Sequence, residues 1–305
     1  MVVAPKHTPY DGDTPQFKIG LQPLDMADWI EVDDDLEIYL AEKDRLISEF
    51  PEQVFAAEAG TEEAQQEILD LLVSYLLENF SKIYQLRDGA MVFGDRVVDL
   101  NGANDTSVPP LMIAAKLVQE DLVLMRQQED GWRIAAGSVS FPSSWDLVEK
   151  FSLVLQDVHK NVPGFEPGTR NAHMINRIFD NLLVDQPVRR FNWSAYADPQ
   201  LYHGGKKAIS LPSLNKDTRE DSIFLRVEHQ TLRKLAISGG ILFTIRIHID
   251  PLAALRAHPS GDELCHGIVA QLELLDHDQL AYKGLVGAKD NLVAKLQAIH
   301  SGEKN

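Results

Sequence analysis

The segment Leu225–Leu252, which reads LRVEHQTLRKLAISGGILFTIRIHIDPL, constrains the fold of this chain more than any other. Residues 223–230 and 241–249 have the apolar and β-branched composition that is typical of strands. The glycines at 239 and 240 provide a bend before the second strand, and a short helix or turn is expected over residues 231–238. Ionisable side chains stand among these apolar residues, and their burial is costly unless each is paired or used. The segment therefore predicts two strands of a sheet that also carries a site.

Helical spacing of apolar residues occurs on both sides of this sheet in the sequence. It predicts helices over residues 36–58, 61–80, 170–183, 251–257, 260–275 and 285–299. Further strands are expected over residues 116–126, 132–141 and 188–196, and the loop QQEDG joins the first two as a hairpin. Residues 1–20 are rich in Pro, Gly and Asp and are expected to form an irregular arm. Residues 21–305 are expected to form a single domain. A central antiparallel sheet flanked by N- and C-terminal helices is an α+β fold.

The charge of the chain limits its partners. The 305 residues carry a formal net charge of −17, from 46 acidic and 29 basic residues. This balance argues against nucleic acid or an anionic membrane as a partner, because such binding requires clustered Lys and Arg. The acidity serves solubility, or it attracts a cationic substrate or a basic protein.

The N-terminus lacks the apolar core of a signal peptide, and no apolar run approaches the roughly 20 residues of a membrane span. A cytoplasmic protein is expected.

Several common sites are not supported by the sequence. With Cys265 as the single cysteine, a disulfide, a Cys-ligated zinc finger or an iron–sulfur cluster within one chain is excluded. We expect Cys265 to be a small buried residue of a helix. GxGxxG, GxxxxGK[ST], GxSxG and HExxH motifs do not occur. The run Asp276-His277-Asp278 is expected to form an exposed loop. Surface positions are expected for His7, His203, His258 and His300.

His159 is a candidate metal ligand within the stretch FPSSWDLVEKFSLVLQDVHKNVPG, residues 141–164. It ends an apolar segment typical of helix and precedes Val162-Pro163-Gly164, where the residue before proline is driven out of helical geometry. A histidine held at such an end ligates a metal or haem iron through one ring nitrogen, while the other nitrogen donates to a nearby carbonyl. Alternatively, it caps the helix C-terminus without any ligand.

Ionisable residues of the two later strands are candidates for a shared site. Arg226 and Glu228 are two apart and share a face, whereas His229 faces the other way. Arg246 and His248 likewise share one face of their strand. If the two strands pair, one cavity is expected to be lined by Arg226, Glu228, Arg246 and His248. A carboxylate in it binds a protonated amine or relays protons, and arginines pair with acidic groups of a cofactor. The alternative is a salt-bridge ladder on the solvent face.

Several blocks of the chain resemble the haem-dependent oxidative N-demethylase family, which includes the haem subunit of dimethylamine monooxygenase. These blocks are GLQPLDMADWIEVDDDLEIYLAEK, KLVQEDLVLM, FPSSWDLVEK, DVHKNVPG, PVRRFNW and LRVEHQTLRKL…ILFTIRIHIDPL. They cover most of residues 18–257 in the same order. The resemblance implies a PAS-like fold that holds one haem b, uses O2 as co-substrate and receives NADPH-derived electrons from a separate reductase subunit. A small methylated amine would be demethylated with release of formaldehyde, and an oligomer is compatible with this expectation.

Motif position assigns expected roles to individual residues. His159 stands where the family has its histidine before a proline-rich turn, so it is the expected axial iron ligand. Glu228 matches the glutamate of the family's Glu-Arg-Gln-Thr-Leu block and is expected to orient the substrate or deliver protons, with His229 beside it at the catalytic centre. Arg246 matches an Ile-Arg pair and is expected to anchor a haem propionate. Cofactor contacts are also expected for Arg226 and His248.

The chain departs from the family pattern at some positions. His229 stands where arginine is usual, His248 where tyrosine is usual, Ala236 where proline is common, and Lys160-Asn161 lacks the first proline of the turn. An enzyme is still the first expectation. The alternative is a PAS-like haem or ligand sensor without turnover, because a histidine at either substituted position could be a second axial ligand that blocks oxygen. A subunit that has lost its cofactor is a third reading, which the presence of both His159 and Glu228 disfavours.

Overall fold

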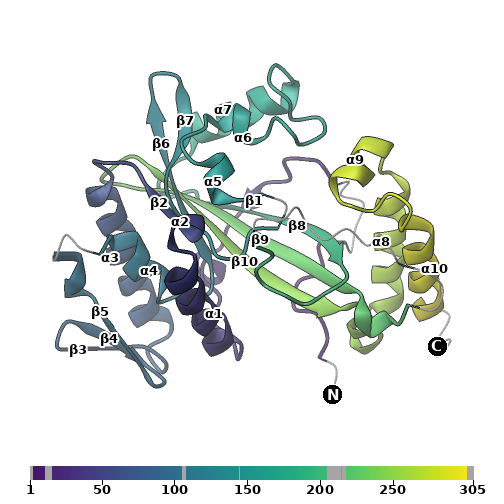
Figure 1. The fold of residues 1–305 in the computed structure, drawn as a ribbon, viewed down its shortest axis with the longest axis horizontal. Coiled ribbons are helices and arrows are strands. Elements are labelled where there is room, and N and C mark those ends of the chain that lie inside the picture. Colours follow the sequence, from purple (N-terminus) through teal and green to yellow (C-terminus); the bar gives the residue numbers. More distant parts are fainter. Residues whose placement is uncertain are drawn as a thin grey trace.

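The computed structural model describes residues 3–10, 16–104, 108–143, 145–204, 214 and 218–300. Its main element is a 7-stranded antiparallel sheet with the order β1-β8-β9-β10-β6-β7-β2. The strands are β1 (Gln22–Pro23), β2 (Phe55–Ala57), β6 (Asp121–Gln128), β7 (Gly131–Ser138), β8 (Val188–Tyr196), β9 (Phe224–Lys234) and β10 (Ile241–Pro251). The long strands β9 and β10 run through the middle of the molecule (Figure 1). The mixed α/β composition and the large antiparallel sheet are as predicted.

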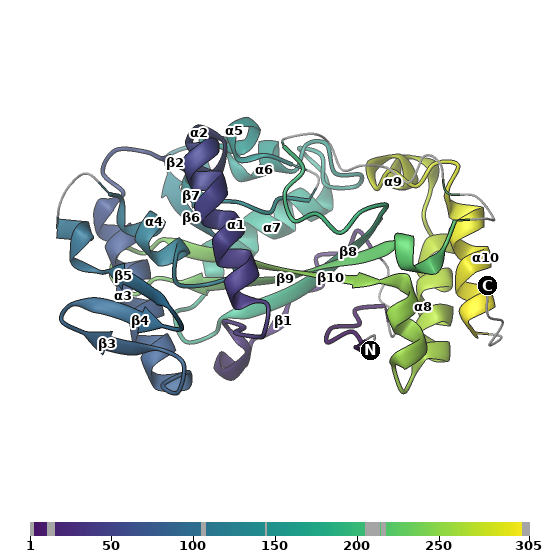
Figure 2. The ribbon, with the colours of Figure 1, turned by 60° about the horizontal axis from the view of Figure 1, so that its bottom comes forward.

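Helices lie at both ends of this sheet and over part of one face (Figures 1 and 2). The N-terminal part contains η1 (Met26–Asp28), α1 (Leu36–Glu49), α2 (Pro51–Val54), α3 (Glu62–Asn79), η2 (Asn101–Asn104) and α4 (Pro110–Ala115). It also holds a small 3-stranded sheet of β3 (Gln85–Arg87), β4 (Ala90–Phe93) and β5 (Arg96–Asp99). The middle part contributes α5 (Leu147–Lys150), α6 (Leu155–Val158) and α7 (Arg170–Asn181). The C-terminal part contributes η3 (Glu220–Ser222), η4 (Leu252–Ala257), α8 (Gly261–Glu273), α9 (His277–Tyr282) and α10 (Lys289–His300).

The two faces of the sheet are covered differently. On the face that carries Leu124 of β6 and Val227 of β9, α3 packs at one end and α8 with α10 at the other. The opposite face carries Val123 and Phe243, and α6 and α7 cover part of it through Phe179. We call these the helix-packed face and the cavity face. Because strand side chains alternate, each strand contributes to both faces with a period of two.

The helix expected over residues 36–58 is divided in the structure. Pro51 cannot donate a backbone hydrogen bond, so α1 ends at Glu49 and α2 is a single turn. Residues after it form β2, in which Phe55 is opposite Ser138 of β7. The helix predicted from residue 61 forms as α3 over Glu62–Asn79, with Ile68 and Leu72 in the core.

Strand β6 starts later than predicted, at a buried carboxylate. Asp121 accepts hydrogen bonds from the backbone N–H groups of Ser140 (2.8 Å) and Phe141 (2.9 Å), so it holds the chain that leaves β7. Burial raises the pKa of Asp121 to about 6. The hairpin between β6 and β7 is short, because Gln128 already pairs with Gly131.

Strand β9 is longer than the sequence predicts. Residues 231–234, expected to begin a helix or turn, continue the ladder with β10, and the turn spans residues 235–240. The carboxylate of Glu67 in α3 accepts hydrogen bonds from the backbone N–H groups of Ile237 and Ser238, both at 2.8 Å. Glycine suits position 240 at the end of the turn, since a Cβ there would lie 2.9 Å from the Leu124 side chain and 3.2 Å from the carbonyl oxygen of Met125.

The C-terminal helices correct two further expectations. The segment 285–299 contains only part of one helix, α10, and α9 precedes it. Asp276-His277-Asp278 is not a loop, because Asp276 caps α9 and forms a capping box with Gln279. Cys265 is buried in α8, as predicted.

Candidate functional site

A cavity of about 800 Å³ lies on the cavity face of the sheet. Its floor is formed by β6, β7, β8, β9 and β10, and its other walls come from the arm, the α6–α7 region and the end of α9. Most of the wall is apolar, with side chains such as Phe17, Leu21, Val123, Ile134, Phe179 and Phe243. Such a volume lies within the roughly 300–1,000 Å³ that is typical of pockets for small molecules and cofactors.

His159 lines this cavity and is held in one orientation. It is the C-cap residue of α6, and its Nδ1 lies 3.0 Å from the carbonyl oxygen of Leu155. Nδ1 is therefore the protonated nitrogen that donates to this carbonyl, which leaves Nε2 with a free lone pair. Burial lowers the pKa of His159, so the ring is neutral at pH 7. Within the described part of the chain, Nε2 has no hydrogen-bond partner. The ring therefore has the neutral charge, the fixed tautomer and the fixed orientation that are typical of a metal-ligating histidine.

Glu228 of β9 also lines the cavity, and neighbouring amides fix its carboxylate. Gln230 Nε2 donates to Glu228 Oε2 at 2.5 Å, and Asn192 Nδ2 of β8 lies 3.4 Å from the same oxygen. The side chains of residues 228 and 230 share a face because they are two apart in a strand. Glu228 is buried, so its charge is presented to the cavity and not to bulk water.

Among the cations that line the cavity are half-buried Arg190 and buried Lys283, which sequence analysis missed. Arg190 of β8 lines it, and Arg190 Nε has no hydrogen-bond partner among the described residues. Burial lowers the pKa of Arg190, and the charge of Glu228 opposes that shift. Lys283 donates to the carbonyl oxygen of Trp193 at 2.5 Å, and burial lowers the pKa of this lysine to about 7. The alternation in PVRRFNW, which places residues 190, 192 and 194 on one face, is the signal that was available.

Arg226 shares the face of Glu228, as predicted, but it is not among the residues that line the cavity. Its guanidinium group is completely committed to other partners. It donates to the carbonyl oxygens of Phe141, Gln200 and Leu201 and to Ser143 Oγ. Arg226 therefore joins loops beside the cavity, and its contact with a cofactor is not supported by this geometry.

The expectation that Arg246 and His248 share a cavity with Glu228 is wrong. In the β9–β10 ladder, Glu228 is opposite Ile247 and His229 is opposite Arg246. Directly opposed residues of an antiparallel pair lie on the same face, so Arg246 and His248 are on the side of His229. Arg246 donates to Asp33 Oδ2 at 2.7 Å and to the carbonyl oxygen of Ile247, so it is paired within the protein.

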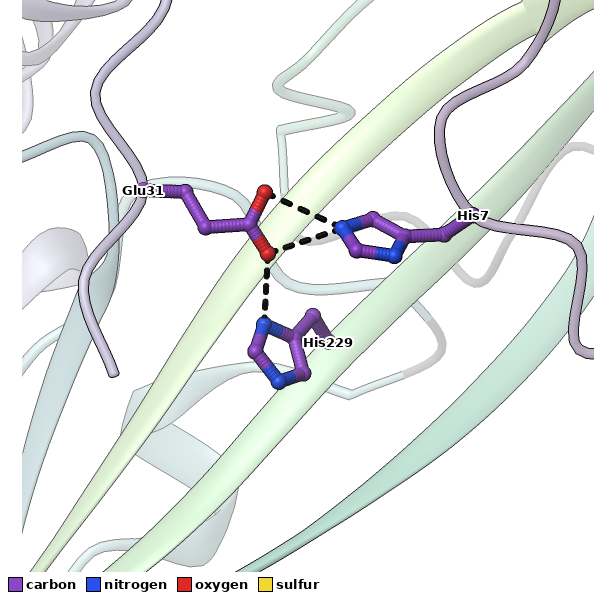
Figure 3. Close-up of side chains that lie close together, drawn as sticks. All are labelled: His7, Glu31 and His229. Carbon is purple, nitrogen blue, oxygen red and sulfur yellow. Dashed lines mark hydrogen bonds and ion pairs between the residues drawn. The ribbon is translucent and has the colours of Figure 1, made fainter. Parts of the chain in front are cut away.

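His229 is likewise absent from the cavity and forms a cluster on the helix-packed face (Figure 3). Its Nδ1 lies 2.7 Å from Oε1 of Glu31, and His7 Nε2 lies 2.8 and 3.0 Å from the two oxygens of the same carboxylate. His248 Nε2 is 3.4 Å from Glu31 Oε2. The surface position expected for His7 is therefore wrong, and so is that of His203, whose side chain is 3% exposed.

Burial and hydrogen bonding shift the pKa values of this cluster in opposite directions. Burial raises the pKa of Glu31, but hydrogen bonds with His229, His248 and His7 outweigh it and hold that pKa well below its usual range. Burial lowers the pKa of His248 to about 4, against the opposing effect of Glu31. At neutral pH the cluster therefore combines an ionised carboxylate with a neutral His248 ring.

The fold and the cavity define a protein with space for a large, mainly apolar group beside a neutral histidine nitrogen and a buried carboxylate. The sequence model of the family described as haem-dependent oxidative N-demethylase, alpha subunit-like, matches residues 20–293. The chain belongs to this family. The family name denotes a haem-dependent oxidoreductase, and "alpha subunit" implies a complex of several subunits. Among the described residues, no helix has the length and apolar character needed to cross a bilayer.

The cavity residues fit a haem group. Among the described residues His159 Nε2 has no partner at the wall, and its second nitrogen is fixed by Leu155, as is usual for histidines that ligate a metal. The apolar lining suits the porphyrin face, and the unpartnered Arg190 Nε suits an acidic substituent of the ring.

Proposed function

We propose that this chain is a haem-dependent oxidoreductase that removes a methyl group from a small methylated amine and releases formaldehyde. Haem b would be held in the 800 Å³ cavity by His159 Nε2, on a sheet that we regard as PAS-like. The single observation that carries this proposal is His159 itself, with Nδ1 bonded to Leu155 and Nε2 at the cavity wall without a partner among the residues that the structure describes. Bound haem supplies the activation of O2, which amino-acid side chains do not provide.

The cations around the cavity are assigned to the acidic edge of the cofactor. Arg190 has a donor nitrogen without a partner in the described structure, and a propionate would both satisfy it and relieve the cost of its burial. Lys283, with a pKa of about 7, donates a hydrogen bond in either protonation state. These two residues replace Arg226, whose guanidinium nitrogens donate elsewhere, and Arg246, which lies on the helix-packed face and pairs with Asp33.

Glu228 is assigned to the substrate. A protonated amine entering an apolar cavity loses its hydration, and a carboxylate held by Gln230 and Asn192 compensates that loss and orients the N-methyl group. The overall reaction converts the N-methylated amine, O2, two electrons and two protons into the demethylated amine, formaldehyde and water. Glu228 is the buried carboxylate positioned to pass the protons.

Electrons come from a partner in this proposal. The chain has no Gly-rich dinucleotide motif, and its one cysteine excludes an iron–sulfur cluster held within the chain. A reductase that delivers NADPH-derived electrons fits the family description of this chain as an alpha subunit.

The test is formaldehyde release from a panel of methylated amines, with NADPH and a surrogate reductase. Glu228→Gln keeps the shape of the side chain but removes its charge, so we expect at least a tenfold loss of kcat/KM while the haem spectrum is retained. Glu149→Gln is the matched control, because Glu149 also lines the cavity but is exposed. Equal turnover in Glu228→Gln and wild type would exclude the role of Glu228, and haem binding without turnover of any amine would favour a sensor.

The sensor alternative loses its original basis in this structure. It depended on His229 or His248 as a second axial ligand, and both side chains lie on the helix-packed face while His159 and the cavity lie on the other. A ligand on the opposite side of a continuous sheet cannot reach the same iron as His159.

A further inference from the structure

Four ligand-type side chains from four separate segments meet on the helix-packed face, away from the cavity. His7 comes from the N-terminal arm, Glu31 from the loop before α1, His229 from β9 and His248 from β10. None of them is among the residues that line the cavity. Three of them, His7, Glu31 and His229, place one donor atom each within 4.8 Å of the others. Convergence of these residue types from distant positions is what metal sites require.

The spacing of the donor atoms is close to that of a coordination sphere. Zinc binds imidazole nitrogen and carboxylate oxygen at about 2.0–2.1 Å, so donors around a tetrahedral ion lie about 3.3 Å apart. The nitrogen–oxygen distances here are 2.7 Å for His229, 2.8 and 3.0 Å for His7 and 3.4 Å for His248. Room for an ion requires the contacts of His229 and His7 with Glu31 to lengthen, and the donor atoms of these three residues already lie within 4.8 Å of one another (Figure 3).

His248 is incompletely satisfied without an ion. Its Nε2 is buried and has no hydrogen bond of good geometry among the described residues, since Glu31 Oε2 lies 3.4 Å away. His229 differs, because its Nδ1 faces Glu31 and only the Nε2 on the other edge of the ring lacks a partner in the described part of the chain. An ion beside Glu31 would give His248 Nε2 the missing interaction and would bind His229 through Nδ1.

We propose that His7, Glu31 and His229, with His248 as the adjacent fourth donor, bind one divalent transition-metal ion of the zinc type. The ligand set is two or three imidazoles and one carboxylate, which suits zinc and its first-row neighbours more than calcium or magnesium. Because His7 belongs to the arm and His229 to the central sheet, the ion fastens the arm onto the sheet. The site is independent of the haem proposal, since it lies on the other face.

The test uses the full-length, untagged chain as purified, dialysed against a chelator and then titrated with Zn²⁺ by calorimetry. We expect one equivalent bound with a dissociation constant of micromolar or below, and the same stoichiometry by elemental analysis. His7→Ala should weaken binding at least tenfold. His7 is the informative position because it lies in an irregular arm, where truncation leaves the sheet intact. His173→Ala, an exposed histidine of α7, should bind as wild type does.

A second measurement keeps the proposal independent of folding defects. Zn²⁺ at one fixed concentration should raise the Tm of the wild-type chain and of His173→Ala equally, and it should raise the Tm of His7→Ala by less. The far-UV circular dichroism of all three should coincide. Wild type that binds no Zn²⁺ at micromolar concentration, or a His7→Ala variant that binds with wild-type affinity, would overturn the site and leave only a hydrogen-bonded cluster.

Discussion

At the scale of single residues, the surroundings decide which side chains are available for chemistry. Half-buried His159 and buried His229 are both bonded to an oxygen, yet one meets a carbonyl and the other a carboxylate. The carbonyl of Leu155 fixes a neutral tautomer with one nitrogen free at the cavity. Similarly, Arg226 and Arg190 point from neighbouring strands, but only Arg190 retains an unused donor beside the cavity among the residues that the structure describes.

The role of Arg190 is open to a direct test. Arg190→Met should raise the haem dissociation constant about tenfold or more, because a hydrogen bond to a charged group contributes roughly 1.5–3 kcal/mol. The rate of haem transfer to a haem-free acceptor protein measures this. Arg189→Met is the matched control, since Arg189 pairs with Asp28 and does not line the cavity. Equal transfer rates from the two variants would disprove the assignment of Arg190.

Lys283 predicts a specific pH dependence of stability. Its pKa is lowered by burial from 10.5 to about 7, so between these values the unfolded chain binds more protons than the folded chain. The free energy of unfolding should therefore rise with pH above 7, by up to about 1.4 kcal/mol per unit from this residue. In Lys283→Met this contribution is lost. Urea unfolding at pH 7 and pH 9 should show wild type gaining stability relative to the variant, and parallel pH profiles would contradict the prediction.

The candidate site was predictable only in part, and the missing information was the strand register. His159 was predictable because the apolar helix and the following Pro163 locate a helix end. Arg246 was misplaced because its face depends on the length of the β9–β10 turn. Arg246 is opposite His229 in the ladder. A turn that used one residue more or fewer would shift the register by one and put Arg246 opposite a residue whose side chain is on the cavity face.

At the scale of elements, buried polar groups connect helices to the sheet. Lys43 of α1 is fully buried and donates to the carbonyl oxygens of Val118 at 3.0 Å and Glu120 at 2.5 Å. It thereby holds the segment that leads into β6. Burial lowers the pKa of Lys43 to about 8, against the nearby charges of Asp121 and Glu120, so the ammonium form persists at pH 7.

Replacing Lys43 should loosen this connection. Lys43→Met leaves buried carbonyls without a donor and removes one cation from beside two buried carboxyl groups, so we expect the free energy of unfolding to fall by about 2 kcal/mol. Chemical denaturation measures the change. Arg45→Met on the same helix is the control, because Arg45 is exposed and pairs with Glu42 and Glu49 of its own helix. The account of α1 fails if both variants unfold at the same denaturant concentration.

The positions of helices and strands could be predicted where the hydrophobic periodicity agreed with the residues that end such elements. The strand Val188–Tyr196 and the helix that starts near Thr61 appear where they were expected. The predictions failed where tertiary pairing overrode local pattern, as at Phe55–Ala57, which join the sheet through β7 although they extend a helical pattern. The continuation of β9 through residues 231–234 has the same cause, since β10 supplies the partner.

At the scale of the whole molecule, one sheet separates two environments. The cavity face carries His159, Glu228 and Arg190 around a large apolar space, and the helix-packed face carries the cluster around Glu31. Because the strands alternate, the same three strands β8, β9 and β10 contribute to both faces. A change in the metal cluster is therefore expected to leave the cavity chemistry intact, which His7→Ala tests through its haem spectrum.

The central claim is that His159 holds haem in the cavity, and one absorption spectrum tests it most directly. The full-length chain purified from cells supplied with haem should show a Soret band with one haem per chain. His159→Ala should lose that band, and His173→Ala should keep it. A colourless wild-type protein, or a Soret band that is unchanged in His159→Ala, would contradict the account.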